Sequence, residues 1–157
     1  MLTFKHLKLG VLGAFLLFLL VPTGALAQTL RLSVANSIDL GRWVGIGDKV
    51  GESDVCVHNS AGSGYSITAS AGGSYQLSGT NGTIVYEVGF SDTLPPGTYT
   101  TLPHGSARSF SGADQSSQTC GGGYNARVRI TVTEATLSSA RPGNYTGTVT
   151  LTLSTSP

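Results

Sequence analysis

Two segments of this chain alternate strictly between apolar and polar residues. In the segment nearer the start, the apolar residues all fall on even positions: Leu30, Leu32, Val34, Ile38 and Leu40. In the last segment, the positions that alternate with threonine are Tyr145, Gly147, Val149, Leu151 and Leu153. Strict alternation places one apolar row on one face of a β-strand. Both segments are therefore predicted to be strands that bury a single face.

Further β-strands are predicted along the whole length between these two segments. Together, the predicted strands cover residues 29–40, 54–58, 65–69, 75–77, 83–90, 126–133 and 145–153. Asn81-Gly82 marks a tight turn before one of them, because both central positions of such a turn need a positive φ. No stretch of a dozen residues carries a helical apolar stripe, so we expect almost no helix. The alternation is lost between residues 91 and 123, where only residues 98–102 suggest a strand. The pattern predicts an all-β chain, most simply an immunoglobulin-like β-sandwich.

The first 27 residues have the features of a secretory signal peptide. Lys5 and Lys8 form a basic start, residues 11–21 are almost entirely apolar, and Ala25-Leu26-Ala27 resembles a cleavage site. The alternative is a retained membrane anchor, but the apolar run is short for a span, which needs about 20 residues. We expect Gln28 to begin the mature protein, with residues 28–157 forming one domain.

Charge is sparse in the predicted mature chain. The whole sequence has nine Lys and Arg residues and eight Asp and Glu residues. Loss of Lys5 and Lys8 with the signal peptide leaves seven basic residues against eight acidic ones, a net charge of −1. A nucleic-acid surface and a polybasic membrane patch both need clustered basic residues. Neither partner is therefore expected.

Cys56 and Cys120 are both in the predicted mature chain. An even number of cysteines in an exported protein indicates a disulfide, and the spacing matches neither a metal motif nor C-x-x-C. A reactive or metal-binding pair is the weaker alternative. Closure of so long a loop would contribute about 4 kcal/mol of stability.

The sequence offers no set of residues with the pattern of a catalytic or cofactor site. His58 and His104 are expected to be exposed in loops, and no G-x-S-x-G motif is present. Asp48, Glu52 and Asp54 lack the ligand spacing of a calcium loop, so an acidic solvated turn is expected. Trp43 is expected to pack on a sheet, with a sugar-stacking platform as the alternative. We expect no catalytic residue, cofactor or metal, and the chain is not predicted to be an enzyme.

Several features together resemble a family. They are the signal peptide followed at once by an alternating strand, the single cysteine pair, and the Gly/Ser/Thr-rich β body. The most specific feature is the last segment, Gly143-Asn144-Tyr145-Thr146-Gly147-Thr148-Val149-Thr150-Leu151-Thr152-Leu153. Cys56 followed by the run Tyr65-Ser66-Ile67-Thr68 is similar too. The chain resembles bacterial pilins of the chaperone–usher type, in particular the spore coat protein U-like branch that builds archaic pili.

The resemblance implies an immunoglobulin-like sandwich that lacks its final strand and takes one from another molecule. The donor strand would be residues 28–40, through Leu30, Leu32, Val34, Ile38 and Leu40. The acceptor edge would be formed by Tyr145, Val149, Leu151 and Leu153. The implied partners are other pilin subunits, a periplasmic chaperone, an outer-membrane usher and a host or surface ligand. The implied function is a structural subunit of a surface fimbria that contributes to adhesion or biofilm formation.

One alternative stays open on the sequence alone. The chain would then be a stand-alone secreted β-sandwich with a self-complete fold, and it would bind a ligand such as a carbohydrate. Trp43 and the segment 91–123 would form its binding surface.

Overall fold

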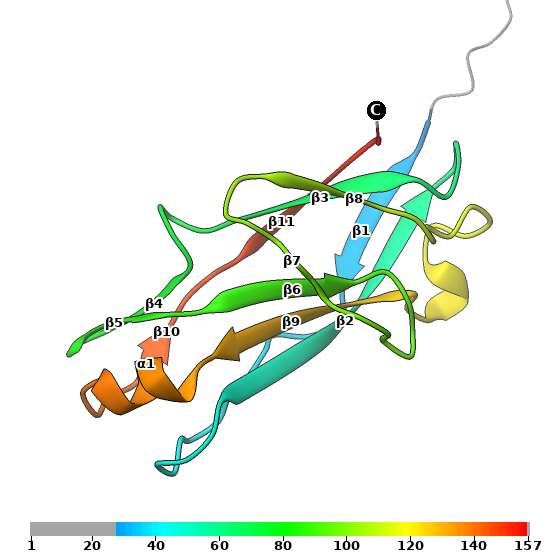
Figure 1. The fold of residues 1–157 in the computed structure, drawn as a ribbon. Helices are drawn as coiled ribbons and strands as arrows, with labels where there is room; N and C mark the ends of the chain where they lie inside the picture. Colours follow the sequence, from blue (N-terminus) through cyan, green and yellow to red (C-terminus); the bar gives the residue numbers. More distant parts are fainter. Residues whose placement is uncertain (1–27, 157) are drawn as a thin grey trace, which may run out of the picture.

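The structure is a computed structural model that describes residues 28–156. The predicted signal peptide, residues 1–27, lies outside the described residues, as does Pro157. The described part is mostly β-structure, arranged in three antiparallel sheets (Figure 1), and it contains one disulfide. Within residues 28–156, no helix is both long enough and apolar enough to cross a membrane.

The largest sheet has five strands in the order β1-β2-β9-β6-β7. These are β1 (Leu30–Val34), β2 (Lys49–Asn59), β9 (Ala126–Val132), β6 (Glu87–Ser91) and β7 (Thr100–Thr101). β2 is the longest, and its inward-facing row includes Val55 and Val57, both fully buried. In β9, the predicted alternation is confirmed, because buried and partly exposed residues alternate along its whole length.

Two three-stranded sheets complete the β-structure of the described residues. One has the order β10-β4-β5, with β10 (Tyr145–Thr146), β4 (Gln76–Gly79) and β5 (Gly82–Val85). The other has the order β11-β3-β8, with β11 (Thr150–Ser154), β3 (Tyr65–Ser70) and β8 (Ala107–Phe110). The predicted turn at Asn81-Gly82 is confirmed: it joins β4 to β5, and Gly82 has a φ of 127°.

One apolar core is shared by all three sheets. Its largest fully buried side chains are Tyr65, Phe90, Ile67, Leu102, Val55, Val57, Val88 and Val132. They come mainly from the inward-facing rows of β2, β3, β6 and β9. Tyr65 meets Phe90 edge-on and stacks on Phe110, so the core joins the largest sheet to the β11-β3-β8 sheet.

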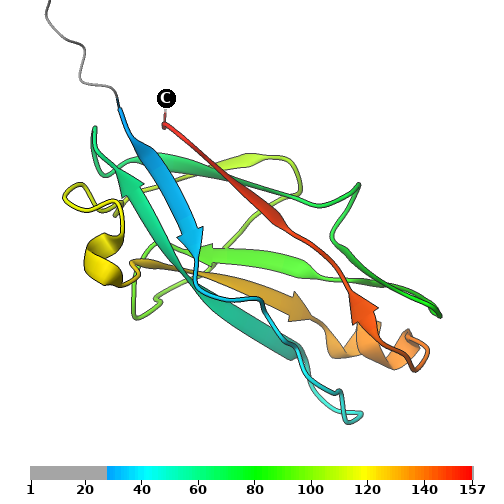
Figure 2. The same cartoon turned by 180° about the vertical axis from the view of Figure 1, so that it is seen from behind.

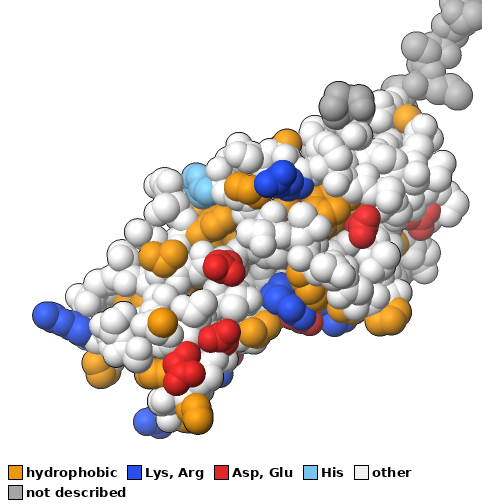
Figure 3. Space-filling model, in the orientation of Figure 1, with side chains coloured by type: hydrophobic (Ala, Val, Ile, Leu, Met, Phe, Trp, Pro, Cys, Tyr) orange, Lys and Arg blue, Asp and Glu red, His pale blue; other side chains and the backbone are white. Residues whose placement is uncertain are grey.

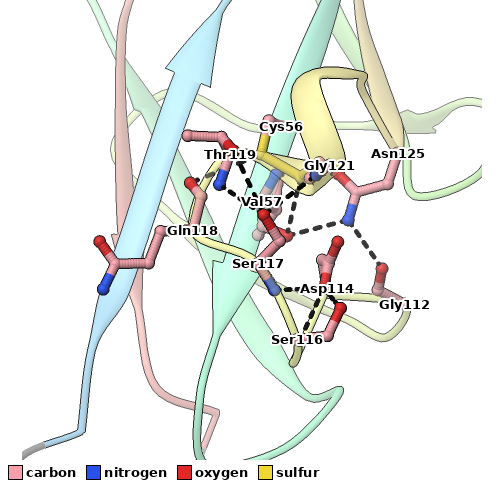
Figure 4. The surroundings of a disulfide bond; sticks show 11 residues. Cys56, Val57, Gly112, Asp114, Ser116, Ser117, Gln118, Thr119, Gly121 and Asn125 are labelled. Carbon is pink, nitrogen blue, oxygen red and sulfur yellow. Dashed lines mark hydrogen bonds between the residues drawn. A yellow bond between two sulfur atoms is a disulfide. The ribbon is translucent and has the colours of Figure 1, made fainter.

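The predicted disulfide between Cys56 and Cys120 is present, and it closes a loop of 64 residues (Figure 4). Cys120 begins the short 3₁₀ helix η1 (Cys120–Gly122), so the bond attaches this helix to β2. The nearby Asn125 side chain accepts from the Val57 N–H at 2.8 Å and donates to the carbonyls of Val57 and Gly112. Beyond the end of the β2–β9 ladder, the Asn125 side chain therefore makes the hydrogen bonds to the backbone N–H and carbonyl of Val57 that a neighbouring strand would otherwise make.

Several predictions about the elements are wrong. The strand predicted at 29–40 ends at Val34, and that predicted at 83–90 divides at Tyr86 between two sheets. The strand predicted at 145–153 is interrupted between β10 and β11, where the chain passes from one sheet to another. β2 begins five residues earlier than expected, and the segment 91–123 contains β8 as well as β7.

The short helix α1 (Glu134–Ser139) was not expected. Its first turn is held by two side chains. The Thr133 Oγ1 accepts from the Thr136 N–H at 3.4 Å, and the Asp48 Oδ1 accepts from the Glu134 N–H at 2.8 Å. A helix of six residues has fewer than two turns, which is too short for an apolar stripe to repeat. Periodicity alone therefore cannot find such a helix.

Candidate functional site

Two strands at sheet edges face each other across one side of the molecule. β1 pairs only with β2, and β11 pairs only with β3, among the described residues. Near the chain termini β1 and β11 lie side by side, and they diverge toward the opposite end (Figure 2). No ladder joins them in the part of the chain described, so each presents an unpaired backbone edge to the gap.

An apolar groove of about 420 Å³ runs between these two edges. One wall consists of β1 and the segment that follows it, and the other consists of β11 and the residues just before it. The floor comes from β4, β9 and Tyr86. The lining residues are Leu32, Val34, Asn36, Ser37, Ile38, Leu40, Leu77, Tyr86, Val128, Ile130, Gly147, Thr148, Val149 and Leu151. None of these described residues is charged.

The apolar rows along the groove are only half-buried, in contrast to the neighbouring rows. Leu151 and Leu153 on β11 are partly exposed, while their cross-strand partners on β3, Ala69 and Ile67, are fully buried. On the opposite wall, Val34 is 46% exposed. Concave, mostly apolar surfaces with a few polar groups are typical of binding sites in proteins. The groove is therefore the strongest candidate for a binding site in the described residues.

The wall beyond β1 is fixed by an unusual crossing of the chain over β2. Next to β1, the Ala35 N–H still donates to the Asp54 carbonyl. At Asn36, however, the backbone bonds to a side chain instead: the Ser53 hydroxyl accepts from the Asn36 N–H at 3.2 Å and donates to its carbonyl at 2.9 Å. After Asn36 the chain leaves the edge of β2 and passes over Gly51, and residues 36–40 are called the crossing segment. This crossing explains why the strand predicted at 29–40 stops early.

The groove floor contains a buried hydroxyl without a partner. Tyr86 is 3% exposed, and its hydroxyl makes no hydrogen bond within residues 28–156. Its ring stacks on Tyr75, whose own hydroxyl donates to the Ala69 carbonyl. Burial raises the pKa of Tyr86 above its ordinary value.

The residues predicted as acceptor edge lie along one chain segment. Val149 and Leu151 line the groove, and Tyr145 and Leu153 pack beside it, at the edge of the core. Four of the predicted donor residues, Leu32, Val34, Ile38 and Leu40, line the opposite wall, and Leu30 is not among the lining residues. Leu30, Leu32 and Val34 belong to β1, which is paired with β2 of the same chain, and Ile38 and Leu40 follow in the crossing segment. Their role as donors stays a prediction, and it would require β1 to leave β2.

The acidic residues considered as calcium ligands lie elsewhere and have other partners. Glu52 and Asp54 are on the outward face of β2, where they form ion pairs with Arg129 and Arg127. Burial acts to raise the pKa of Glu52, but hydrogen bonds from Arg129 and Tyr99 and the arginine charges outweigh it and lower that pKa. Among the described residues, no group of three His, Cys, Asp or Glu side chains is arranged to hold a metal ion.

The two histidines and Trp43 differ in their surroundings. The expectation that His58 is exposed is wrong: it lies in β2 and is 3% exposed, beside the segment that the disulfide holds against this strand. His104 is exposed as expected, with its Nε2 close to the backbone of Ala71. Trp43 is half-buried in the loop before β2, and its indole N–H donates to the Gly47 carbonyl.

On the face of the molecule seen in Figure 3, charged side chains are scattered singly or in small groups among a mostly uncharged surface.

Comparisons with known proteins add no identification. No protein-family model matches the chain, and no curated protein matches it.

Proposed function

We propose that this protein is a structural subunit of a surface fibre, and that its groove receives a β-strand from another subunit. The observation that carries the proposal is the uncharged apolar groove between two unpaired strand edges. An inserted strand would satisfy both the apolar floor and the free backbone groups, which a small ligand would not. In this proposal the fold is an immunoglobulin-like sandwich completed from outside.

The chemistry of the groove defines the face of the strand that would enter. Since none of the described lining residues is charged, the entering row must be uncharged. The even row of residues 28–40 fits this requirement, because Arg31 and Asp39 both fall on odd positions. Since β1 is part of its own sheet, a donor of this sequence would come from a copy whose β1 has left β2, or from a related subunit.

Within the proposal, the free groove needs protection before assembly. A periplasmic chaperone would cover it, and an outer-membrane usher would exchange the chaperone for the next subunit. The finished fibre would stand on the cell surface and contribute to adhesion or biofilm formation. The scarcity of charge and the abundance of Ser and Thr suit a protein that is held in a polymer.

A matched pair of substitutions on β11 tests the proposal. Leu151 faces the groove, and its neighbour Thr152 is exposed. Leu151→Asp places a carboxylate in the apolar groove, while Thr152→Asp adds the same charge outside it. We expect Leu151→Asp to abolish binding of a synthetic peptide of residues 28–40 and assembly into oligomers, and Thr152→Asp to leave both intact.

The measurements are peptide binding by fluorescence anisotropy and oligomer size by light scattering. Circular dichroism of each variant verifies that the β-structure is retained. If the unmodified chain stays monomeric and binds no strand peptide, the proposal is wrong, and the stand-alone secreted binding module becomes the better hypothesis.

A further inference from the structure

Two small residues on the inner face of β2 stand directly behind one wall of the groove. Gly51 is buried and pairs with Ile130 of β9, and Ser53 lies two residues further along the same face. A Cβ at Gly51 would overlap the Ile38 Cγ2 and lie 2.9 Å from the Leu40 Cδ2. Ile38 and Leu40 therefore occupy the space that any other residue at this position would fill.

The same two side chains line the groove. Each of them is thus in contact with Gly51 on one side and with the open groove on the other. Because Ser53 anchors the nearby Asn36 through two hydrogen bonds, the crossing segment is fixed just before these residues. A side chain at position 51 would therefore displace Ile38 and Leu40 toward the groove, where the space is free.

We infer that Gly51 determines the size of the side chain that the groove admits at its Ile38–Leu40 end. This inference rests on the proposed function, and the occupant it assumes is an uncharged strand of the 28–40 type from another subunit. With glycine at position 51, the two side chains sit back and a large aliphatic residue fits. With a larger residue there, the same end accepts only a small one.

The test combines chain variants with peptide variants. The chain carries Gly51→Ala, and the probes are the synthetic peptide 28–40 and two derivatives with Leu30→Ala or Leu40→Ala. We expect Gly51→Ala to weaken binding of the unmodified peptide by about tenfold, as expected for partial loss of one buried aliphatic contact. One of the two derivatives has its alanine at the narrowed end of the groove. The Gly51→Ala chain and the unmodified chain should bind this derivative with dissociation constants within about threefold of each other.

Gly89→Ala is the matched control. Gly89 is also a strand glycine of the largest sheet, but the atoms nearest to a Cβ there belong to Tyr99, none closer than 3.4 Å, and Gly89 is not among the lining residues. Its peptide affinities should not change. Gly51→Ala combined with Ile38→Ala should restore most of the affinity for the unmodified peptide, because the second change removes the side chain that a Cβ at position 51 overlaps most.

Ile38→Ala alone keeps the inference testable if Gly51→Ala does not fold. This variant widens the same end of the groove. It should therefore bind a peptide that carries phenylalanine at the residue entering this end more tightly than the unmodified chain binds it. Equal loss of affinity for all three peptides in Gly51→Ala, or no gain in Ile38→Ala, would overturn the inference while leaving the proposed function standing. Failure of every peptide to bind the unmodified chain would overturn both.

Discussion

Truncation of a groove residue should affect stability differently in the free and the strand-filled protein. Leu151 is partly exposed in the free chain and lines the groove, whereas Ile67 on the adjacent strand is fully buried. Complete truncation of a buried Leu or Ile to Ala costs roughly 2–5 kcal/mol. For half-buried Leu151, we expect Leu151→Ala to lower the free energy of unfolding of the free chain by about 1.5 kcal/mol.

An inserted strand would cover the part of Leu151 that is exposed in the free chain. In the complex, Leu151→Ala should therefore cost about 3 kcal/mol, and the difference of about 1.5 kcal/mol corresponds to roughly tenfold weaker peptide binding. Ile67→Ala is the control, since Ile67 is already buried before any strand enters. It should destabilise the free chain more than Leu151→Ala does, by about 3–4 kcal/mol, yet leave peptide affinity unchanged.

The assay is urea unfolding followed by far-UV circular dichroism, with and without a saturating concentration of the 28–40 peptide. Direct titration gives the affinities and closes the thermodynamic cycle. The reasoning is refuted if Leu151→Ala costs the same free energy with and without the peptide. It is refuted equally if Ile67→Ala weakens binding more than Leu151→Ala, because affinity would then follow general stability and not groove contact.

Three further predictions concern parts of the fold away from the groove. Replacement of both Cys56 and Cys120 by serine should lower the free energy of unfolding by about 4 kcal/mol in urea titrations, the value for a loop of 64 residues. Asn125→Ala removes three hydrogen bonds to backbone groups and should cost about 2–3 kcal/mol in the same assay, with increased amide exchange at Val57. The lowered pKa of Glu52 means that its stabilising contribution is present above the ordinary value of 4.5 and is lost as the pH falls through the folded-state pKa. Glu52→Gln should therefore reduce the loss of stability between pH 6 and pH 3 by about 1 kcal/mol or less, measured by urea unfolding at each pH.

The sequence predicts correctly those elements whose residue pattern follows from their own position in the fold. Residues 126–133 alternate because one face of β9 meets the core, and Asn81-Gly82 makes its turn from its own backbone preferences. The cysteine pair was predictable from the count, since a chain with two cysteines offers one intramolecular pairing. For the strand and the turn, the information lies within the segment itself.

The errors occur where a distant residue decides the outcome. The first strand ends at Val34 because Ser53, seventeen residues beyond Asn36, supplies the hydrogen bonds that a strand neighbour would otherwise make. His58 is buried beside a segment that is held against β2 by the disulfide between Cys56 and Cys120, which are 64 residues apart in the chain. Such contacts follow from the packing of the whole chain, and no periodicity in the segment reveals them.

The groove combines both situations. Alternation correctly predicts that Val149 and Leu151 share one face, the one that lines the groove, yet it does not say what packs against that face. Residues 30–34 carry the same signal, and the structure pairs them with β2 of their own chain. An apolar row reads identically whether its partner strand is in the same molecule or in another one. The partly exposed Leu151 beside fully buried Ala69 shows where apolar surface stays partly uncovered in this fold, on the side between β1 and β11, and the proposal assigns that surface to a strand from another subunit.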